Sequence, residues 1–235
     1  MMTTAERITR ARADYDDVYE AGKRAECDSF WDEFQGNGDN AFPAQFAGKG
    51  WTKETFKPKY DIRVTNGYFL FYQNAARVDL PEWLDGLGIK LDTSELVSAQ
   101  YLFWMAEFTH IGEIDFRKLQ TSAGHTSQTF TCSYLVTIDK IILRDDGTNT
   151  FAANMFQNAT KLENITFEGV IGYSIDFRYS PLSRESITNI IEHLSSAATG
   201  QTCTFKKSAK ETAFTNDEWE TLVSSKPNWQ IELVT

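Results

Sequence analysis

A pair of apolar residues separated by one other residue recurs along this chain at nearly constant spacing. The pairs begin at Ile62, Ile89, Ile114, Ile141, Ile165, Cys203 and Ile231. Successive first members are 27, 25, 27, 24, 38 and 28 residues apart. Periods of about 20–29 residues that each contain one short strand are typical of solenoids. The pattern therefore predicts an α/β solenoid with one curved, mainly parallel sheet.

An aromatic residue upstream of the strands supports the same register. Phe71, Phe103, Phe130 and Phe156 precede the next apolar pair by 18, 11, 11 and 9 residues. The longer first interval contains a predicted short helix, which Asp79 would cap, Glu82 would support in a capping box and Gly86 or Gly88 would end.

The repeats are predicted to occupy residues 61–180, between two caps. Residues 41–60 carry aromatic residues scattered among Gly, Lys and Pro, which suits an irregular N-terminal cap over the first repeat. Residues 181–235 are interpreted as an α/β C-terminal cap. Together, residues 41–235 form the predicted solenoid domain.

Two helices and two strands are expected within the C-terminal cap. An amphipathic pattern begins after Ser183, and a capping box opens a second helix at Thr215 and Glu218. Strands are expected near 202–206 and 230–234, where they would continue the sheet.

Residues 1–40 are predicted to form a helix followed by a hinge. Apolar residues step by three or four along the helix, as in a coiled-coil seam, and a turn-rich stretch follows at residues 36–40. The helix either packs on its own domain or serves docking or oligomerisation. The candidate oligomerisation residues are Ile8, Ala11, Tyr15 and Val18.

The repeat unit at residues 156–167 carries a family resemblance. Phe156, Ala159, Leu162, Ile165 and Phe167 follow the Phe-x-x-Cys-x-x-Leu-x-x-Ile-x-Ile core of BspA-like leucine-rich repeat proteins, with Ala159 in the Cys place. The overall layout is also similar to that of small proteins encoded by phages and prophages of gut bacteria. The resemblance implies a leucine-rich-repeat solenoid and a place in a phage particle, and it names no activity.

Composition limits the partners. The formal net charge of −10 argues against nucleic-acid binding and against attraction to anionic membranes. The N-terminus has no apolar segment of a signal peptide, and no apolar run approaches the roughly 20 residues that span a bilayer. We therefore expect synthesis in the cytoplasm without an export signal, and a virion location after assembly.

Candidate catalytic and metal-binding residues are few. Cys27, Cys132 and Cys203 lie far apart, so buried thiols are expected rather than a zinc site or a disulfide framework. Cys132 with His125 lacks the motif of an activated nucleophile. Asp145-Asp146-Gly147 is typical of a turn. No metal, cofactor or catalytic residue is predicted, and the chain is not expected to be an enzyme.

The outward positions of the predicted strands form a candidate binding face. In a regular stack, Asp92 would lie beside Arg117, and Arg144 beside Glu168. Two interpretations are open: a ladder of solvated ion pairs, or a polar recognition face for a protein or a glycan. The candidate binding residues are Arg63, Lys90, Asp92, Asp115, Arg117, Arg144, Thr166 and Glu168. Candidate aromatic anchors in the loops are Tyr68, Tyr72, Trp104, Tyr173 and Tyr179.

Three functions from different classes follow. The first is a non-enzymatic binding or structural protein of a phage virion, with a helix that attaches or oligomerises and a solenoid that binds protein or glycan. The second is a cytoplasmic protein-interaction module of the host or prophage. The third is a glycan hydrolase, for which an acid such as Asp115 would have to be essential.

Overall fold

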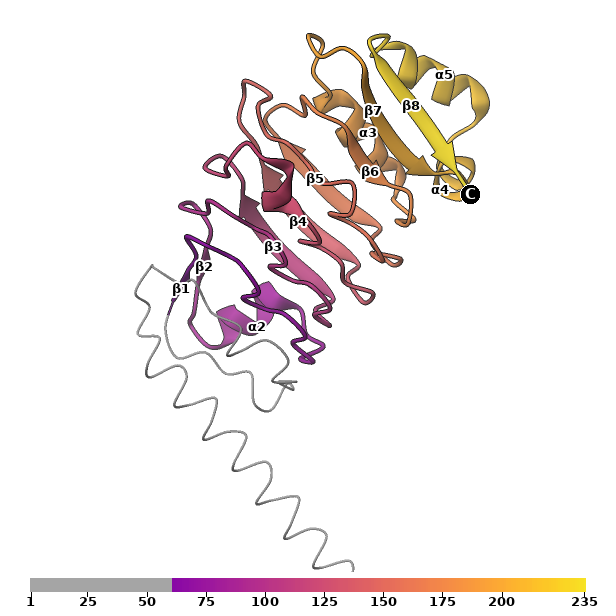
Figure 1. Ribbon diagram of the computed structural model, residues 1–235. Coiled ribbons are helices and arrows are strands. Elements are labelled where there is room, and N and C mark those ends of the chain that lie inside the picture. Colours follow the sequence, from indigo (N-terminus) through magenta and orange to yellow (C-terminus); the bar gives the residue numbers. More distant parts are fainter. Residues whose placement is uncertain (1–60) are drawn as a thin grey trace, which may run out of the picture.

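The computed structural model describes residues 61–235 (Figure 1). The predicted helix and hinge at 1–40, the cap at 41–60, the candidate oligomerisation residues and Cys27 lie outside the described residues. Within them the fold is mixed α/β, with short parallel strands, four α-helices and one 3-10 helix. In chain order the elements are β1 (Ile62–Arg63), α2 (Leu80–Gly86), β2 (Leu91–Asp92), β3 (His110–Asp115), η1 (Ala123–Thr126), β4 (Thr137–Ile142), β5 (Asn164–Glu168), β6 (Ile175–Phe177), α3 (Arg184–His193), β7 (Gln201–Lys206), α4 (Lys207–Ala213), α5 (Asn216–Ser224) and β8 (Trp229–Val234).

The strands form three small parallel sheets, ordered β1-β2, β3-β4-β5 and β6-β7-β8. The parallel pairing is as predicted, and the prediction of one continuous sheet is wrong. The first break has a structural cause in α2. Its N-cap, Asp79, forms a parallel bridge with His110 of β3, so the helix begins where a neighbouring strand would run.

The second break lies beside β5, where α3 stands in the place of a strand. One hydrogen-bond series joins the starts of successive repeats: Val136 N donates to Thr109 O, Glu163 N to Val136 O and Ser183 N to Glu163 O, at 2.8–2.9 Å. Ser183 is the N-cap of α3. The chain that follows it is helical, and the sheet β3-β4-β5 ends there.

Between the strands the chain returns through segments of consecutive tight turns. Successive segments are joined by backbone hydrogen bonds from Phe71 N to Leu102 O (2.9 Å), Phe103 N to Thr129 O (3.0 Å) and Phe130 N to Met155 O (2.9 Å). Figure 1 shows these segments and the strands β1–β5 as two layers. We call the layers the turn side and the strand side.

A stack of buried phenylalanine rings runs between the layers and crosses both breaks. The centroid distances from Phe71 to Phe103 to Phe130 to Phe156 are 5.2, 5.8 and 5.3 Å. The stack continues to Phe177 of β6 (4.6 Å) and then to Phe205 of β7 (6.1 Å). The sheet β6-β7-β8 therefore follows the turn side, whereas α3 follows the strand side.

The strand β6 is absent from the sequence prediction. Ile175-Asp176-Phe177 has the same apolar-x-apolar pattern as the other strands, and it divides the 38-residue step into 10 and 28. Ten residues are too few for a complete repeat that returns to the strand side. They are enough to connect β5 to β6 because β6 belongs to a new sheet that follows the turn side. The predicted strands β7 and β8 are confirmed, although they do not continue the sheet of β5.

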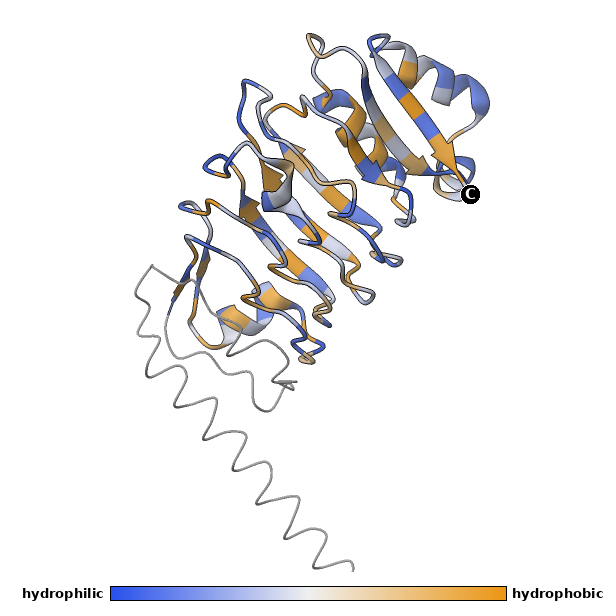
Figure 2. Ribbon diagram, in the orientation of Figure 1, coloured by the Kyte–Doolittle hydropathy of each residue, from blue (hydrophilic) through white to orange (hydrophobic). Residues whose placement is uncertain are grey.

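The predicted N-cap at Asp79 and the predicted capping box of Thr215 and Glu218 are confirmed, whereas the Glu82 half of the predicted α2 capping box is not formed. Asp79 accepts a hydrogen bond from Glu82 N at 3.0 Å, and Thr215 and Glu218 form a complete capping box at α5. Most of the apolar repeat positions are buried as predicted, whereas Leu91, Ile231 and Leu233 are only partly buried. In the unit that resembles the BspA-like core, Phe156 to Phe167, every core residue is at most 3% exposed. Figure 2 shows hydrophobic and hydrophilic residues alternating along β8, as the period-2 pattern requires.

Candidate functional site

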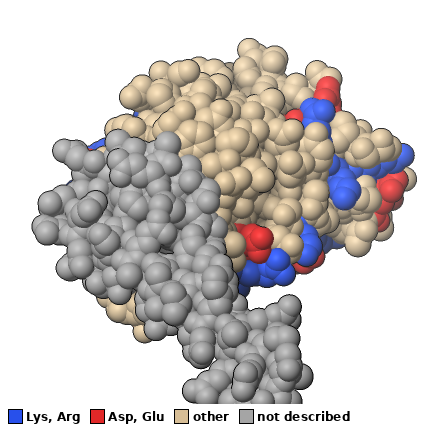
Figure 3. Space-filling view, turned by 60° about the horizontal axis from the view of Figure 1, so that its bottom comes forward, with Lys and Arg blue, Asp and Glu red and all other residues tan. Residues whose placement is uncertain are grey.

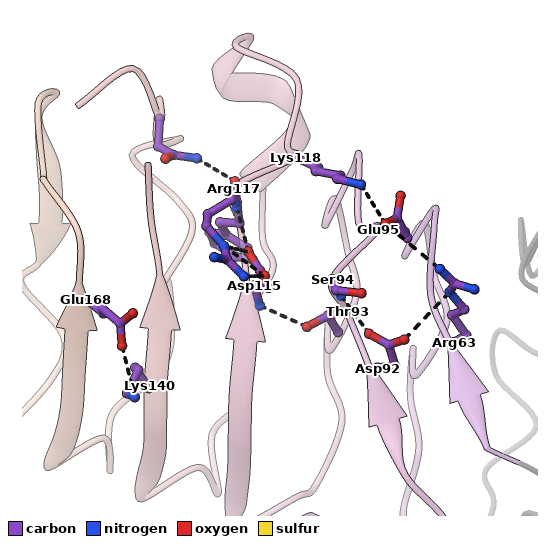
Figure 4. Close-up of polar contacts among 12 residues, drawn as sticks. Arg63, Asp92, Thr93, Ser94, Glu95, Asp115, Arg117, Lys118, Lys140 and Glu168 are labelled. Atoms are coloured by element: carbon purple, nitrogen blue, oxygen red, sulfur yellow. Dashed lines mark hydrogen bonds and ion pairs between the residues drawn. The ribbon is translucent and has the colours of Figure 1, made fainter. Parts of the chain in front are cut away.

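The candidate binding residues lie on the strand side, with partners that differ from the predicted ones (Figure 4). Asp92 pairs with Arg63, with 3.6 Å between Oδ2 and Nε, because the β1-β2 register places Arg63 directly opposite Asp92. Hydrogen bonds from Ser94 lower the pKa of Asp92. Glu95 joins the same group through Arg63, with 3.9 Å between Oε1 and Nη2, and it also pairs with Lys118 at 2.5 Å. The predicted pair of Asp92 with Arg117 is not formed.

Asp115, the last residue of β3, and Arg117 bind each other. The Arg117 backbone N–H and Nε donate to Asp115 Oδ1 at 2.9 and 3.1 Å, and Nη2 lies 2.6 Å from Oδ2. Asp115 was expected to face solvent, but Arg117 covers it and leaves it 7% exposed. The same Ile-Asp-Phe-Arg sequence recurs at 175–178, where Asp176 and Arg178 repeat the contact.

Glu168 pairs with Lys140 and not with Arg144, which contradicts the predicted register. A bulge in β4 places Ile141 opposite Phe167 and Ile142 opposite Glu168. Lys140, which the sequence prediction omitted, lies 3.1 Å from Glu168 and 3.3 Å from Glu113. Hydrogen bonds to Glu168 and then Glu113 raise the pKa of the Lys140 ammonium.

Two further predicted positions, Arg144 and Thr166, make side-chain contacts with the backbone of neighbouring repeats. Arg144 Nη2 donates to the Leu119 carbonyl, and the Arg144 backbone N–H donates to Asn149 Oδ1 at 2.8 Å. Thr166 Oγ1 donates to the Asp139 carbonyl. Both side chains join neighbouring repeats.

A groove opens on the strand side where β2 and β3 are unpaired. One part, of about 460 Å³, lies between α2 and β3, and a second part, of about 540 Å³, lies over β1, β2 and β3. The two parts share Lys90, Leu91 and Glu113 among their walls. Pro81 of α2 packs on Gly112 of β3, where an added Cβ would lie 3.2 Å from Pro81 Cγ. This close contact holds α2 as one wall of the groove.

The groove combines apolar walls with an excess of acidic groups. Leu80, Leu84, Ile89 and Leu91 supply apolar surface to the part beside α2. The acidic residues around both parts are Asp61, Glu82, Asp85, Asp92, Glu113, Asp115 and Asp139, against the basic residues Arg63 and Lys90. Of the candidate binding residues, Arg63, Lys90, Asp92 and Asp115 line this groove, and Arg117, Arg144, Thr166 and Glu168 do not.

His110 connects three consecutive parts of the strand side at the edge of the groove. Its Nδ1 lies 2.7 Å from Asp79 Oδ2, the N-cap of α2, and its Nε2 lies 2.7 Å from Asp139 Oδ1 of β4. Only the imidazolium can donate through both nitrogens. Partial burial lowers the pKa of His110, but the two carboxylates outweigh it, and the net direction is upward.

We expect His110 to stabilise the fold more at acidic than at alkaline pH. A folded-state pKa above the unfolded value of about 6.5 gives a contribution that is fully present below that value. The contribution is lost as the pH rises through the folded-state pKa. Urea unfolding should therefore give a larger stability loss for His110→Gln at about pH 5.5 than at about pH 8.5. An equal loss at both pH values would contradict the doubly bonded imidazolium; Asp139→Asn is the companion variant and should weaken the pH dependence.

With this geometry in hand, the chain can be compared with known proteins. No family model, curated protein or solved structure matches it. In residues 61–235, no group of three or more His, Cys, Asp or Glu side chains is arranged to hold a metal ion.

Cys132, Cys203 and the Asp-Gly turn considered as candidates from the sequence are buried or bonded within the fold. Burial raises the pKa of the Cys132 thiol, whose Sγ donates to the Phe103 carbonyl at 2.8 Å. Burial likewise raises the pKa of Cys203. Asp146 accepts hydrogen bonds from the backbone N–H and hydroxyl of Thr148, in the predicted turn. None of the helices within 61–235 has the length and apolar character needed to cross a membrane.

Proposed function

We propose that residues 61–235 are a leucine-rich-repeat type of solenoid and that the protein is a non-enzymatic recognition protein. The parallel pairing of successive units, their 24–28-residue spacing and the continuous phenylalanine stack support the solenoid. In such an architecture each unit packs only on its neighbours, and extended surfaces serve binding.

The observation that carries the proposed function is the acidic, apolar-walled groove between α2 and β3. Glu82 and Asp85 on α2 form no ion pair with any residue in the described part of the chain, and they face the same groove as Glu113. A ligand that places Lys or Arg near these carboxylates and apolar side chains against Leu80 and Leu84 would complement both. We therefore propose that the groove binds a basic, partly apolar segment of a protein partner.

A catalytic role for the groove has less support. Asp115, the acid on which a hydrolase would have depended, has both carboxylate oxygens bound by Arg117. Asp92 is likewise bound by Ser94 and Arg63. General acid–base catalysis needs a carboxyl group that can reach the substrate. Placement in a phage virion stays our first proposal for context, and a cytoplasmic interaction module stays the alternative.

Selection of random peptides on the immobilised full chain tests the groove. We expect enrichment of peptides that combine Lys or Arg with apolar residues. Their affinity should fall about tenfold for Asp85→Lys, because a basic residue then meets a positive charge in the wall. The salt dependence of binding should fall as well.

The matched control is Glu220→Lys on α5, which makes the same change of charge away from the groove. Its affinity should stay at the wild-type level. Enriched peptides without basic residues, or equal losses for the two variants, would contradict the proposed binding site.

A further inference from the structure

The charged residues of the repeats lie on one of the two layers, the strand side, and not on the turn side. From residue 61 to residue 168, every Asp, Glu, Lys and Arg lies on the strand side or at its ends. The stretches 64–76, 96–106, 119–138 and 147–160, which include the turn segments, contain none. Figure 3 shows a broad area without Lys, Arg, Asp or Glu, with charged side chains at its margin. In a chain with 24% charged residues, this separation leaves one layer uncharged.

The first two turn segments carry a cluster of aromatic rings on this uncharged layer. Phe69 stacks on Tyr101 with 4.7 Å between centroids and 8° between ring planes, and Tyr72 stacks on Trp104 at 4.7 Å and 20°. Tyr68 lies across the first stack, at 67° to Phe69 and 66° to Tyr101. Two ring stacks and a transverse ring therefore form one cluster, which draws on both segments.

The backbone beneath the cluster has an uncommon conformation. Phe69 has a φ of 58° and Tyr101 a φ of 59°, in the left-handed region, and the neighbouring Gln73 and Met105 have φ values of 52° and 57°. Bulky residues rarely adopt this region, at a cost on the order of 1–3 kcal/mol each. Hydrogen bonds from Gln73 N to Trp104 O (3.0 Å) and from Met105 N to the next segment (3.0 Å) hold it in place.

The cluster is partly exposed to solvent, and it contains hydroxyl groups that can form hydrogen bonds with a ligand. Tyr68 is 41% exposed and Met105 51% exposed. Within residues 61–235, the phenol groups of Tyr68, Tyr72 and Tyr101 form no hydrogen bond. The adjoining turn segment adds uncharged amide and hydroxyl groups, among them Ser127, which donates to Asn154 at 3.2 Å.

We propose that this aromatic turn face, defined by Tyr68, Phe69, Tyr72, Tyr101, Trp104 and Met105, binds an uncharged oligosaccharide. Aromatic rings have a negative face that attracts the partially positive C–H groups of a sugar ring. Tyrosine hydroxyls, amides and Ser or Thr side chains match sugar hydroxyls as donors and acceptors. A ligand with formal charge gains no ion pair on this layer, and the net charge of −10 repels anionic glycans.

This proposal concerns a second surface and does not rest on the groove. The aromatic turn face and the groove lie on opposite layers, and their lining residues do not overlap. Loss of one activity would leave the other unchanged.

Native affinity electrophoresis of the full chain tests the proposal. The probes are four uncharged polysaccharides (laminarin, dextran, galactomannan and xylan), with polygalacturonate as the anionic comparison. We expect at least one uncharged polysaccharide to retard the wild type. Tyr68→Ala, which removes the most exposed ring of the cluster, should weaken the retardation about tenfold. Gln73→Glu should weaken it as well, because it adds a charge without changing the shape of the side chain.

The matched control is Tyr173→Ala, which removes a ring that is 43% exposed outside the cluster. Its retardation should equal that of the wild type, and thermal unfolding should show that all variants are folded. The proposal is overturned if no uncharged polysaccharide retards the wild type, if only polygalacturonate does, or if Tyr68→Ala and Tyr173→Ala behave alike. Analytical ultracentrifugation supplies the remaining outcome: a dimer that Tyr68→Ala dissociates would assign this face to a second copy of the chain.

Discussion

Replacing Phe130 with alanine is expected to destabilise the protein by about 3–5 kcal/mol. Phe130 is fully buried at the middle of the ring stack, where it contacts Phe103, Phe116 and Phe156 at centroid distances of 5.8, 6.2 and 5.3 Å. Alanine would leave a cavity that the flanking repeats cannot close, because their backbones are tied to each other by hydrogen bonds. Urea unfolding followed by far-UV circular dichroism measures the loss.

The control for Phe130→Ala is Tyr179→Ala, which removes a ring that is 40% exposed. Its effect should stay within about 0.5 kcal/mol of the wild type. Phe130→Leu should fall between the two, because leucine fills part of the space. A loss for Phe130→Ala as small as that of Tyr179→Ala would mean that the stack does not carry the core.

The second large effect is expected for Gly172→Ala, at about 3 kcal/mol or more. An added Cβ at Gly172 would lie 2.0 Å from the carbonyl oxygen and 2.8 Å from the carbonyl carbon of Gly147. Both atoms belong to the backbone, so no side-chain rotation relieves the contact. The chain would have to separate the turn after β4 from the loop that leads into β6.

Gly86→Ala is the matched control, because an added Cβ there meets nothing within 4 Å. Gly86 is the last residue of α2, where alanine is the better helix former, so we expect unchanged or slightly higher stability. Thermal unfolding of the two variants gives the comparison. Equal midpoints would show that the backbones at 147 and 172 can move apart without cost.

Most of the strands could be predicted because they bury an alternating apolar pair. Ile114 with Phe116, and Ile165 with Phe167, are almost fully buried, as a half-buried strand requires. The Phe71-to-Phe156 stack could be predicted because one phenylalanine precedes each of the pairs that begin at Ile89, Ile114, Ile141 and Ile165. These signals depend on residues close together in the sequence, so they do not depend on how the strands are divided among sheets.

The register and the sheet breaks could not be predicted from the same signals. In β4 both Asp139 and Lys140 lie between the inward Ile138 and Ile141, and such a bulge shifts the neighbours of every later residue. The move of the chain from one layer to the other after β5 depends on the contacts of α3. A pattern of apolar pairs contains no information about which layer a pair belongs to.

The groove was outside the reach of the sequence prediction for a related reason. It exists because α2 replaces a strand beside β3, so its walls come from a helix and from β2 and β3, which do not pair with each other. Four of the eight predicted binding residues lie in it, and the α2 acids Glu82 and Asp85 were missed. The predicted N-cap at Asp79 indicated the helix. The groove, however, depends on the packing of this helix against Gly112, which the sequence pattern does not show.

The helix in the place of a strand beside β5 also bears on aggregation. The outer edge of a sheet is a template for strands of other chains, which is how many proteins form fibres. Here Ile165 N donates to Ser186 Oγ at 2.9 Å and Phe167 N donates to Asn189 Oδ1 at 2.7 Å, so side chains of α3 occupy the edge donors of β5. The α3 side chains thus block extension of the β3-β4-β5 sheet by strands of other copies from that edge.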